Sequence, residues 1–181
     1  MIIKMRVISG KYKGRKLNGF SIDGTRPTMD RVKESMFALI QNKLKEAICL
    51  DLFAGSGSLG IEALSNGAKK CYFIDNNQIA IDTIIKNTID IDNKEILKQD
   101  CFIALEEFKN KVKFDIVFLD PPYHDHLINQ VLFKLKENKL LNTNGIVVCE
   151  LEEDNIKTDL KLIKEKKYGN KKVKIFQNED L

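Results

Sequence analysis

A glycine-rich loop next to a carboxylate is the first stretch of the sequence whose residue types suggest chemistry. Apolar residues from Ala47 to Leu52 predict a buried strand, residues 54–58 are small, and a helical pattern follows. This order places backbone N–H groups before a ligand, and Gly55 and Gly57 permit its close approach. Asp51, inside the apolar strand, would repel a pyrophosphate but attract an ammonium or sulfonium group. The combination favours S-adenosylmethionine over NAD, although a plain strand-to-helix turn would need the same glycines.

Three further carboxylates follow predicted strands. Asp75, Asp100 and Asp120 stand at or just after the ends of apolar runs. Ligands of an open α/β sheet bind at the carboxyl ends of its strands, so these residues favour one shared site over separate helix caps. Asp75 follows the glycines at about the distance expected of a carboxylate that binds ribose. Asp100, with Cys101 beside it, is predicted at the adenine end of the same cofactor.

The most specific motif is Asp120-Pro121-Pro122-Tyr123. Its two prolines fix φ and remove two N–H groups, which predicts a rigid loop with carbonyl oxygens facing a pocket. The ring of Tyr123 offers a flat face on which a base can stack. The motif therefore predicts that Asp120, Pro121 and Tyr123 line a rigid ligand-binding loop.

The elements that would position these residues alternate between strands and helices. Strands are predicted at 47–52, 70–75, 95–99, 114–119 and, after an Asn144-Gly145 turn, 146–151; helices are predicted at 59–66, 79–91, 102–108 and 127–135. Strands this apolar are buried on both faces, which is typical of a parallel sheet covered by helices on both sides. Gly169-Asn170 predicts a hairpin that joins strands at 160–168 and 171–177. The fold class is therefore α/β, doubly wound, with a seven-stranded and mostly parallel Rossmann-like sheet that ends in an antiparallel hairpin.

The N-terminal part of the chain is strongly basic. Residues 4–33 carry nine Lys and Arg against two Asp, although the net charge of all 181 residues is only +4. Residues 5–8 and 15–17 predict a small β-hairpin, and a helix is predicted from Thr28 to Leu44. We divide the chain into a basic extension, 1–45, and a catalytic domain, 46–181. This charge indicates a phosphate-rich partner, for which the predicted contacts are Arg6, Lys11, Arg15, Arg26 and Arg31.

Composition excludes several other classes of protein. The four cysteines have no C-x-x-C spacing, which predicts free thiols and no zinc. His124 and His126 lack an evident third ligand, so no metal is expected. No apolar run approaches the roughly 18 residues of a membrane span, and no signal peptide is evident. A cytoplasmic location is expected.

Over nearly its whole length the sequence resembles the class I S-adenosylmethionine-dependent methyltransferases. Within them it is similar to the bacterial family that methylates N2 of a guanine in 16S ribosomal RNA. The segments that carry the resemblance are Arg6–Gly10 with Gly14–Leu17, Thr25–Val32, Leu50–Gly57, Glu62–Ser65, Asp120–Tyr123 and Tyr168–Asn170. Phe53 stands where many members of the wider class carry glycine, whereas this family has an aromatic residue there.

The resemblance implies a reaction and a set of roles. Asp120 and the Pro121 carbonyl would accept the two hydrogens of the guanine amino group, and Tyr123 would stack on the flipped base. S-adenosylmethionine would contact Asp51, Phe53, Gly55, Gly57, Asp75, Asp100 and Cys101. The expected substrate is guanine 966 of the 16S RNA, within an assembling small subunit. A monomer without metal or membrane is expected.

Three other functions stay open at this point. The Asp-Pro-Pro-Tyr motif also occurs in DNA adenine-N6 methyltransferases, which share the chemistry of the reacting amino group. A non-catalytic RNA-binding protein with a relic cofactor pocket is a second alternative, although a relic has no reason to keep both the glycine loop and this motif. An NAD oxidoreductase is the third.

Overall fold

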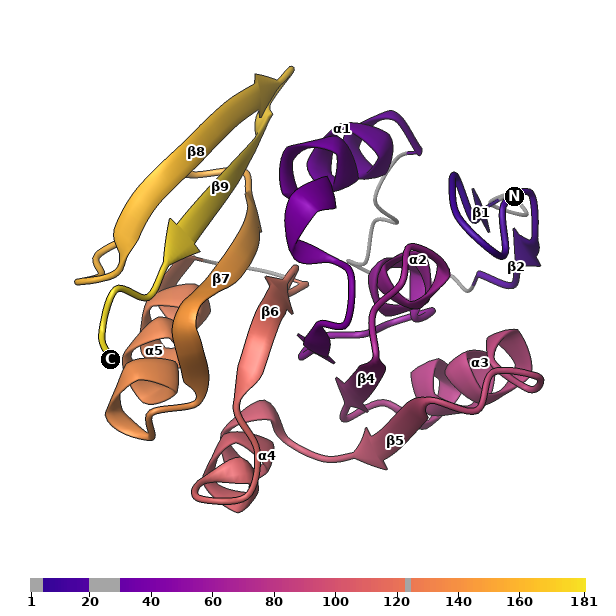
Figure 1. Cartoon of the computed structure of the whole chain (residues 1–181), viewed down its shortest axis with the longest axis horizontal. Helices are drawn as coiled ribbons and strands as arrows, with labels where there is room; N and C mark the ends of the chain where they lie inside the picture. The colour runs from indigo at the N-terminus through magenta and orange to yellow at the C-terminus, as the bar shows by residue number, and fades with distance from the viewer. Residues whose placement is uncertain (1–4, 20–29, 123–124) are drawn as a thin grey trace.

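Seven strands form one sheet in a computed structural model of the chain, which describes residues 5–19, 30–122 and 125–181. The strands are β3 (Ile48–Asp51), β4 (Lys70–Asp75), β5 (Lys94–Lys98), β6 (Phe114–Leu119), β7 (Leu141–Leu151), β8 (Lys161–Tyr168) and β9 (Lys171–Gln177). Their order in the sheet is β5-β4-β3-β6-β7-β9-β8, and only the pairs that involve β9 are antiparallel. The predicted fold class is confirmed (Figure 1).

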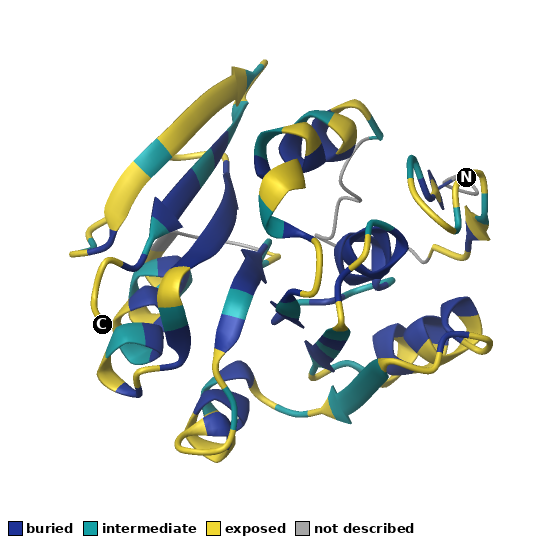
Figure 2. Cartoon of the chain, in the orientation of Figure 1, coloured by how far each residue is buried: buried dark blue, intermediate teal, exposed yellow. Residues whose placement is uncertain are grey.

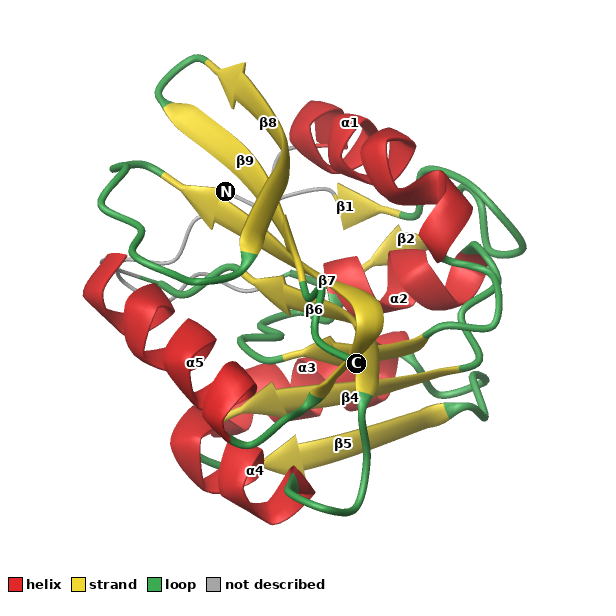
Figure 3. Cartoon of the chain, turned by 60° about the vertical axis from the view of Figure 1, so that its left-hand side comes forward, coloured by secondary structure: helices red, strands yellow, loops and turns green. Residues whose placement is uncertain are grey.

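Helices cover both faces of the sheet. They are α1 (Asp30–Ile40), continued by the 3-10 turn η1 (Gln41–Lys43), α2 (Ser58–Ser65), α3 (Gln78–Asn87), α4 (Cys101–Phe108) and α5 (Asp125–Glu137). Apolar residues of α1, α2 and α3 share one core cluster with one side of the strands, and those of α4 and α5 share a second cluster with the other side. The two layers are visible in Figure 3. Burial follows the same plan, because the central strands are buried while the edge strand β8 is largely exposed (Figure 2).

The basic N-terminal segment packs on this body. It contains the small antiparallel sheet of β1 (Met5–Arg6) and β2 (Lys16–Leu17), as predicted. Met5, Val7 and Leu17 are buried in the same core cluster as α1 and α2. The two predicted segments therefore share a hydrophobic core, and their division into an RNA-binding extension and a catalytic domain stays a prediction about function.

The largest difference from the predicted elements is at the start of β7. The predicted turn at Asn144-Gly145 is wrong, because the strand already begins at Leu141 and runs through both residues. Asn144 has φ 62°, and the pairing of β6 with β7 shifts register between Phe114 and Ile116. This irregularity has the character of a β-bulge, in which an extra residue bends a strand without ending it. The residues that favour a turn therefore also suit this bulge.

Helix α3 is also shorter than its isoleucine pattern suggests. It ends at Asn87, four residues before the predicted end. Ile84 is fully buried, while Ile79 and Ile89 are exposed. No helix of the described residues is long and apolar enough to span a membrane.

Candidate functional site

The four predicted carboxylates lie along one edge of the sheet. Asp51 and Asp75 are the last residues of β3 and β4, Asp100 follows β5 by two residues, and Asp120 directly follows β6. Because β5, β4, β3 and β6 are consecutive parallel neighbours, all four residues stand at the carboxyl edge. The sequence prediction that they share an edge is confirmed, whereas their contacts with a ligand stay predictions.

The glycine loop turns tightly from β3 into α2. Gly55 and Gly57 have φ 57° and 82°, in the left-handed region that glycine tolerates. The Gly57 N–H donates to the Ala54 carbonyl at 2.7 Å and closes the turn. A Cβ on Gly60 would lie 2.3 Å from the ring of Phe73, so this glycine lets α2 pack closely against β4. The loop thus starts α2 after the carboxyl end of β3, where the first N–H groups of a helix have no partners within the helix.

Asp51 lies beneath this loop. Only 2% of the residue is exposed, and its Oδ2 accepts the Gly60 N–H at 3.0 Å. Burial raises the pKa of Asp51 to about 7; the Gly60 hydrogen bond lowers it in part, and the nearby Asp75 charge adds to the rise. Asp51 therefore links the end of β3 to α2, and its attraction for a cationic ligand stays a prediction.

The next two carboxylates organise backbone at the same edge. Asp75 accepts the N–H groups of Gly55 and Asn77, both at 2.9 Å, and so ties the loop to β4. Each of its oxygens has a second lone pair that can accept from a ribose hydroxyl. Asp100 caps α4 by accepting the Phe102 N–H at 2.8 Å. Beside it Cys101 is buried, and burial raises the pKa of this thiol to about 11.

The Asp-Pro-Pro motif stands next to the loop. Asp120 and Pro121 are half-buried and follow β6, which pairs with β3 through Asp51 and Phe118. Phe53 is also half-buried and packs against the core cluster of α4 and α5. Tyr123 lies outside the described residues, as does Arg26. The catalytic role of Asp120, Pro121 and Tyr123 stays a prediction.

A buried ion pair that sequence reasoning missed joins three elements behind the loop. Lys33 of α1 is 1% exposed and its Nζ lies 3.3 Å from Oε2 of Glu62 on α2. The same ammonium donates to Ser58 Oγ at 2.9 Å and to the Arg6 carbonyl. Burial lowers the pKa of Lys33, and Glu62 partly offsets this. Its position between Val32 and Met36, on the apolar face of a helix, is the sequence signal that marks it as buried.

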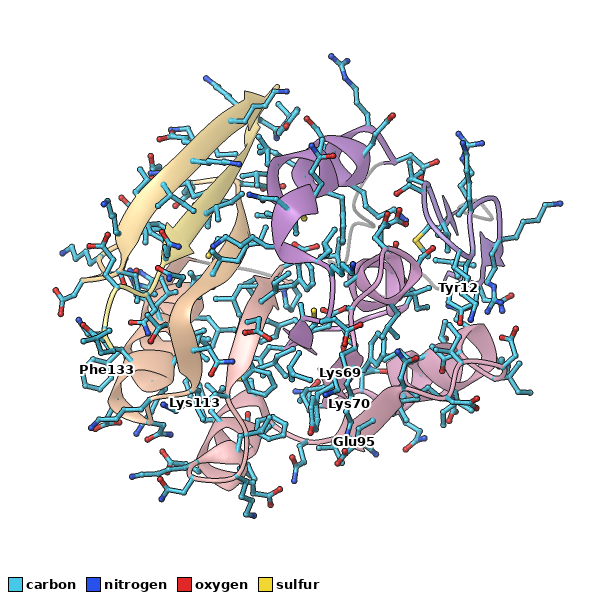
Figure 4. All side chains as sticks on the ribbon, viewed as in Figure 1. Tyr12, Lys69, Lys70, Glu95, Lys113 and Phe133 are labelled. Carbon is cyan, nitrogen blue, oxygen red and sulfur yellow. The ribbon has the colours of Figure 1, made fainter. Side chains whose placement is uncertain are left out.

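The basic surface of the N-terminal segment is therefore smaller than its charge suggests. Lys33 contributes nothing to it, Arg6 pairs with Asp30 at 3.2 Å, and Arg15 pairs with Asp90 at 2.7 Å. Arg15 also stacks on Tyr12, with its guanidinium carbon 4.4 Å from the ring centroid. Lys11 and Arg31 are exposed. Tyr12 lies between the N-terminal hairpin and α3 (Figure 4).

All four cysteines are buried and free, as predicted. Burial raises the pKa of each thiol. Within residues 5–19, 30–122 and 125–181, no three His, Cys, Asp or Glu side chains are grouped as a metal would require. The expectation that the protein needs no metal stays an expectation.

The mostly parallel seven-stranded sheet with helices on both faces is a Rossmann-like fold. Residues 5–177 match the family described as "Conserved hypothetical protein 95". The "Ribosomal RNA small subunit methyltransferase D" of Haemophilus influenzae is 37% identical over 97% of this chain and 94% of its own, and that of Escherichia coli is 32% identical over 97% and 91%. The chain therefore belongs to this family, that of the small-subunit ribosomal RNA methyltransferases D.

Solved structures agree with this assignment. A putative methyltransferase from Escherichia coli superposes with a TM-score of 0.85 at 29% identity, covering 97% of this chain and 98% of the other. A putative methylase from Haemophilus influenzae gives a TM-score of 0.81 at 35% identity, covering 98% and 99%. An RNA methyltransferase from Salinibacter ruber, solved with S-adenosyl-L-homocysteine, shares the fold with a TM-score of 0.65 at 18% identity, covering 84% and 93%.

Proposed function

We propose that this protein transfers the methyl group of S-adenosylmethionine to the exocyclic N2 of a guanine in 16S ribosomal RNA. Membership of a family whose relatives are named small-subunit ribosomal RNA methyltransferases supports RNA methylation. The single observation that carries the chemistry is the position of Asp120 and Pro121, at the carboxyl end of β6 and next to the glycine loop of β3. Acceptors for an amino group at that position would lie beside the proposed cofactor site.

The residues present fit this cofactor. The left-handed glycines permit close approach to the loop backbone, and Asp75 keeps lone pairs for ribose hydroxyls. Asp100 and Cys101 stand at the next strand end, where we assign the adenine. Asp51 and Phe53 complete the proposed set from the end of β3. When bound, the cofactor supplies an activated methyl group on a sulfonium.

The protein's own part in catalysis is to hold and polarise the amino group. The lone pair of a guanine amino nitrogen is delocalised into the ring, which makes it a poor nucleophile. Acceptance of its two hydrogens by the Asp120 carboxylate and the Pro121 carbonyl would localise that lone pair and stabilise the positive charge that develops on nitrogen. Alignment with the methyl group supplies much of the remaining acceleration. We assign stacking on the flipped base to Tyr123.

The direct test is methyl transfer from labelled S-adenosylmethionine to 16S RNA, both free and in assembling subunits, with the product nucleoside identified. We expect N2-methylguanosine, and mapping of the label tests whether it lies at position 966. Methylated adenine, or transfer to DNA in preference to RNA, would instead favour the adenine-N6 alternative. Absence of transfer despite cofactor binding would favour the relic-pocket alternative.

The role of Asp120 makes a separate prediction. Asp120→Ala should lower turnover by about 100-fold or more, because one preorganised partner of the developing charge is lost. Binding of S-adenosylhomocysteine, measured by calorimetry, should change by less than about 3-fold, because this residue is assigned to the nucleophile. The exposed Asp92→Ala is the matched control. An Asp120 variant that loses cofactor affinity and keeps its turnover would contradict the assignment.

A further inference from the structure

A buried ion pair occupies the same edge of the sheet beyond Asp120. Lys171, the first residue of β9, donates to Glu150, the second-last residue of β7. Their side chains are 15% and 3% exposed. Buried ion pairs contribute little net stability, because the cost of removing both charges from water offsets their attraction. Stability is therefore a weak reason for this pair to stand here.

Strand register places the pair beside the proposed reaction centre. Leu119 of β6 lies opposite Cys149 of β7, so Asp120 and Glu150 are the next positions on two neighbouring parallel strands. Glu150 in turn lies opposite Val173, which puts Lys171 two residues further along on the same face. Asp120, Glu150 and Lys171 therefore succeed one another across the sheet in the order β6, β7, β9.

The charges of these residues are coupled. Burial alone would lower the pKa of Lys171, but the hydrogen bond and charge of Glu150, with smaller contributions from Asp120 and Glu152, raise it. The ammonium is thus within electrostatic reach of Asp120 and stays charged at neutral pH. Other lysines of the β8–β9 hairpin form more exposed pairs, such as Lys172 with Asp154 at 3.0 Å.

We propose that Glu150 and Lys171 recognise the Watson–Crick edge of the target guanine, and this rests on the proposed guanine-N2 function. That edge presents, in order, the N2 amino group, the N1–H donor and the O6 acceptor. Asp120, Glu150 and Lys171 present, in the same order, an acceptor for N2, an acceptor for N1–H and a donor for O6. Enzymes that extrude a base read it through hydrogen bonds to this edge.

The same arrangement rejects adenine. Adenine offers an acceptor at N1 and an amino donor at C6, so it would face Glu150 with a lone pair and Lys171 with N–H groups. Both contacts would then be electrostatically repulsive, although the two side chains keep their contact with each other, and a built-in repulsion of this kind lets a site discriminate between similar substrates. The pair therefore explains how a motif shared with adenine methyltransferases would act on guanine.

The test uses RNA in which the target guanine is replaced by 2-aminopurine, which keeps the 2-amino group but lacks both N1–H and O6. Wild-type kcat/KM should be at least about 100-fold lower on this RNA. The double variant Glu150→Gln/Lys171→Met leaves no buried charge without its partner. Its kcat/KM should fall by about 100-fold on guanine RNA but by less than about 3-fold on 2-aminopurine RNA. The ratio of kcat/KM between the two substrates should therefore be much smaller than in the wild type. Intrinsic differences in reactivity between the two bases cancel in this comparison.

Lys161→Met/Glu179→Gln removes an exposed pair at the far end of the β8–β9 hairpin and is the control; it should keep the wild-type ratio. Equal losses on both substrates in the Glu150/Lys171 double variant would overturn the inference, because a purely structural pair affects both alike. That result together with N2-methylguanosine from the wild type would leave the proposed function standing. A wild-type product other than N2-methylguanosine would overturn the proposed function and this inference with it.

Discussion

At the scale of single residues, the charge of Asp51 depends on its burial. In water an aspartate has a pKa of about 3.9, and burial beneath the glycine loop raises that of Asp51 to about 7. The carboxyl is therefore partly protonated at neutral pH. A group in that state is a weaker partner for a sulfonium than an exposed carboxylate. Its described contact, with the Gly60 N–H, explains its position without a ligand.

This titration predicts a pH-dependent stability. The folded state favours protonated Asp51, so its contribution is fully present below the unfolded pKa and is lost as pH rises through about 7. The free energy of unfolding of Asp51→Asn, relative to wild type, should therefore increase by about 2–3 kcal/mol between pH 5 and pH 8. Urea unfolding at both pH values measures this, with the exposed Asp92→Asn as control. Parallel pH profiles for Asp51→Asn and wild type would show that the folded pKa is not raised.

At the scale of elements, the Lys33–Glu62 pair holds three segments together. It connects α1 to α2, while Glu62 also accepts the backbone N–H groups of Ile8 and Ser9 at 3.0 Å. Lys33 bonds Ser58, the first residue of α2 after the glycine loop. The Lys33–Glu62 pair thus holds both the N-terminal segment and the glycine loop in place. The carboxyl edge itself is formed by the strands of the sheet.

Breaking this pair should be costly. Lys33→Met leaves the Glu62 charge buried without its partner and should lower the free energy of unfolding by about 3–5 kcal/mol. The double variant Lys33→Met/Glu62→Gln should recover much of that loss, because no unpaired charge remains. Lys70→Met removes a half-exposed pair with Glu95 and should cost no more than about 1 kcal/mol. Denaturant unfolding compares the four proteins. Equal costs for Lys33→Met and Lys70→Met would contradict the described burial.

At the scale of the whole molecule, the distribution of charge suggests where RNA binds. The β1–β2 segment runs along α2, because Arg6 meets Lys33 near Ser58, whereas the Lys11 N–H donates to Ser65 at the other end. An eight-residue helix is about 12 Å long, so the segment extends by that distance from the glycine loop. We propose that Arg6, Lys11, Arg15, Arg26 and Arg31 contact RNA phosphates. The shared core makes point variants a better test than removal of the segment.

Lys11 is the best position for such a variant, because it is exposed and its substitution leaves no carboxylate without its partner. Arg15→Gln, by contrast, would remove the partner of Asp90. Lys11→Gln should weaken RNA binding and lower the slope of log affinity against log salt by about 0.7–0.9. Affinity for S-adenosylhomocysteine should not change. Lys113→Gln is the control, since Lys113 lies at the amino end of β6, away from the carboxyl edge (Figure 4). If the two variants have the same salt slope, the N-terminal segment is not the main phosphate-binding surface.

Local pattern was sufficient to predict the architecture. Apolar runs followed by carboxylates predicted strands that end at one edge, since parallel strands place their carboxyl ends together, and the β9 limits were predicted to the residue. The free, buried cysteines also follow from spacing and apolar context. These features depend on residues close together in sequence. For that reason the sequence alone predicted a mostly parallel sheet, its C-terminal hairpin and the positions of Asp51, Asp75, Asp100 and Asp120 at the carboxyl edge.

Pairing between distant residues was decided only by the tertiary structure. The sequence places Lys33 on the apolar face of its helix but does not show its partner Glu62, and it shows Glu150 only as the end of a strand, since neither residue has its partner nearby along the chain. Asn144-Gly145 became a bulge because the register of β6 allowed the strand to continue through it. Contacts between residues far apart in sequence depend on how helices and strands pack. The fold thereby buries Lys33, one of the basic residues of the N-terminal segment, in an ion pair with Glu62. It also brings Glu150 and Lys171 to the carboxyl edge at which Asp120 lies.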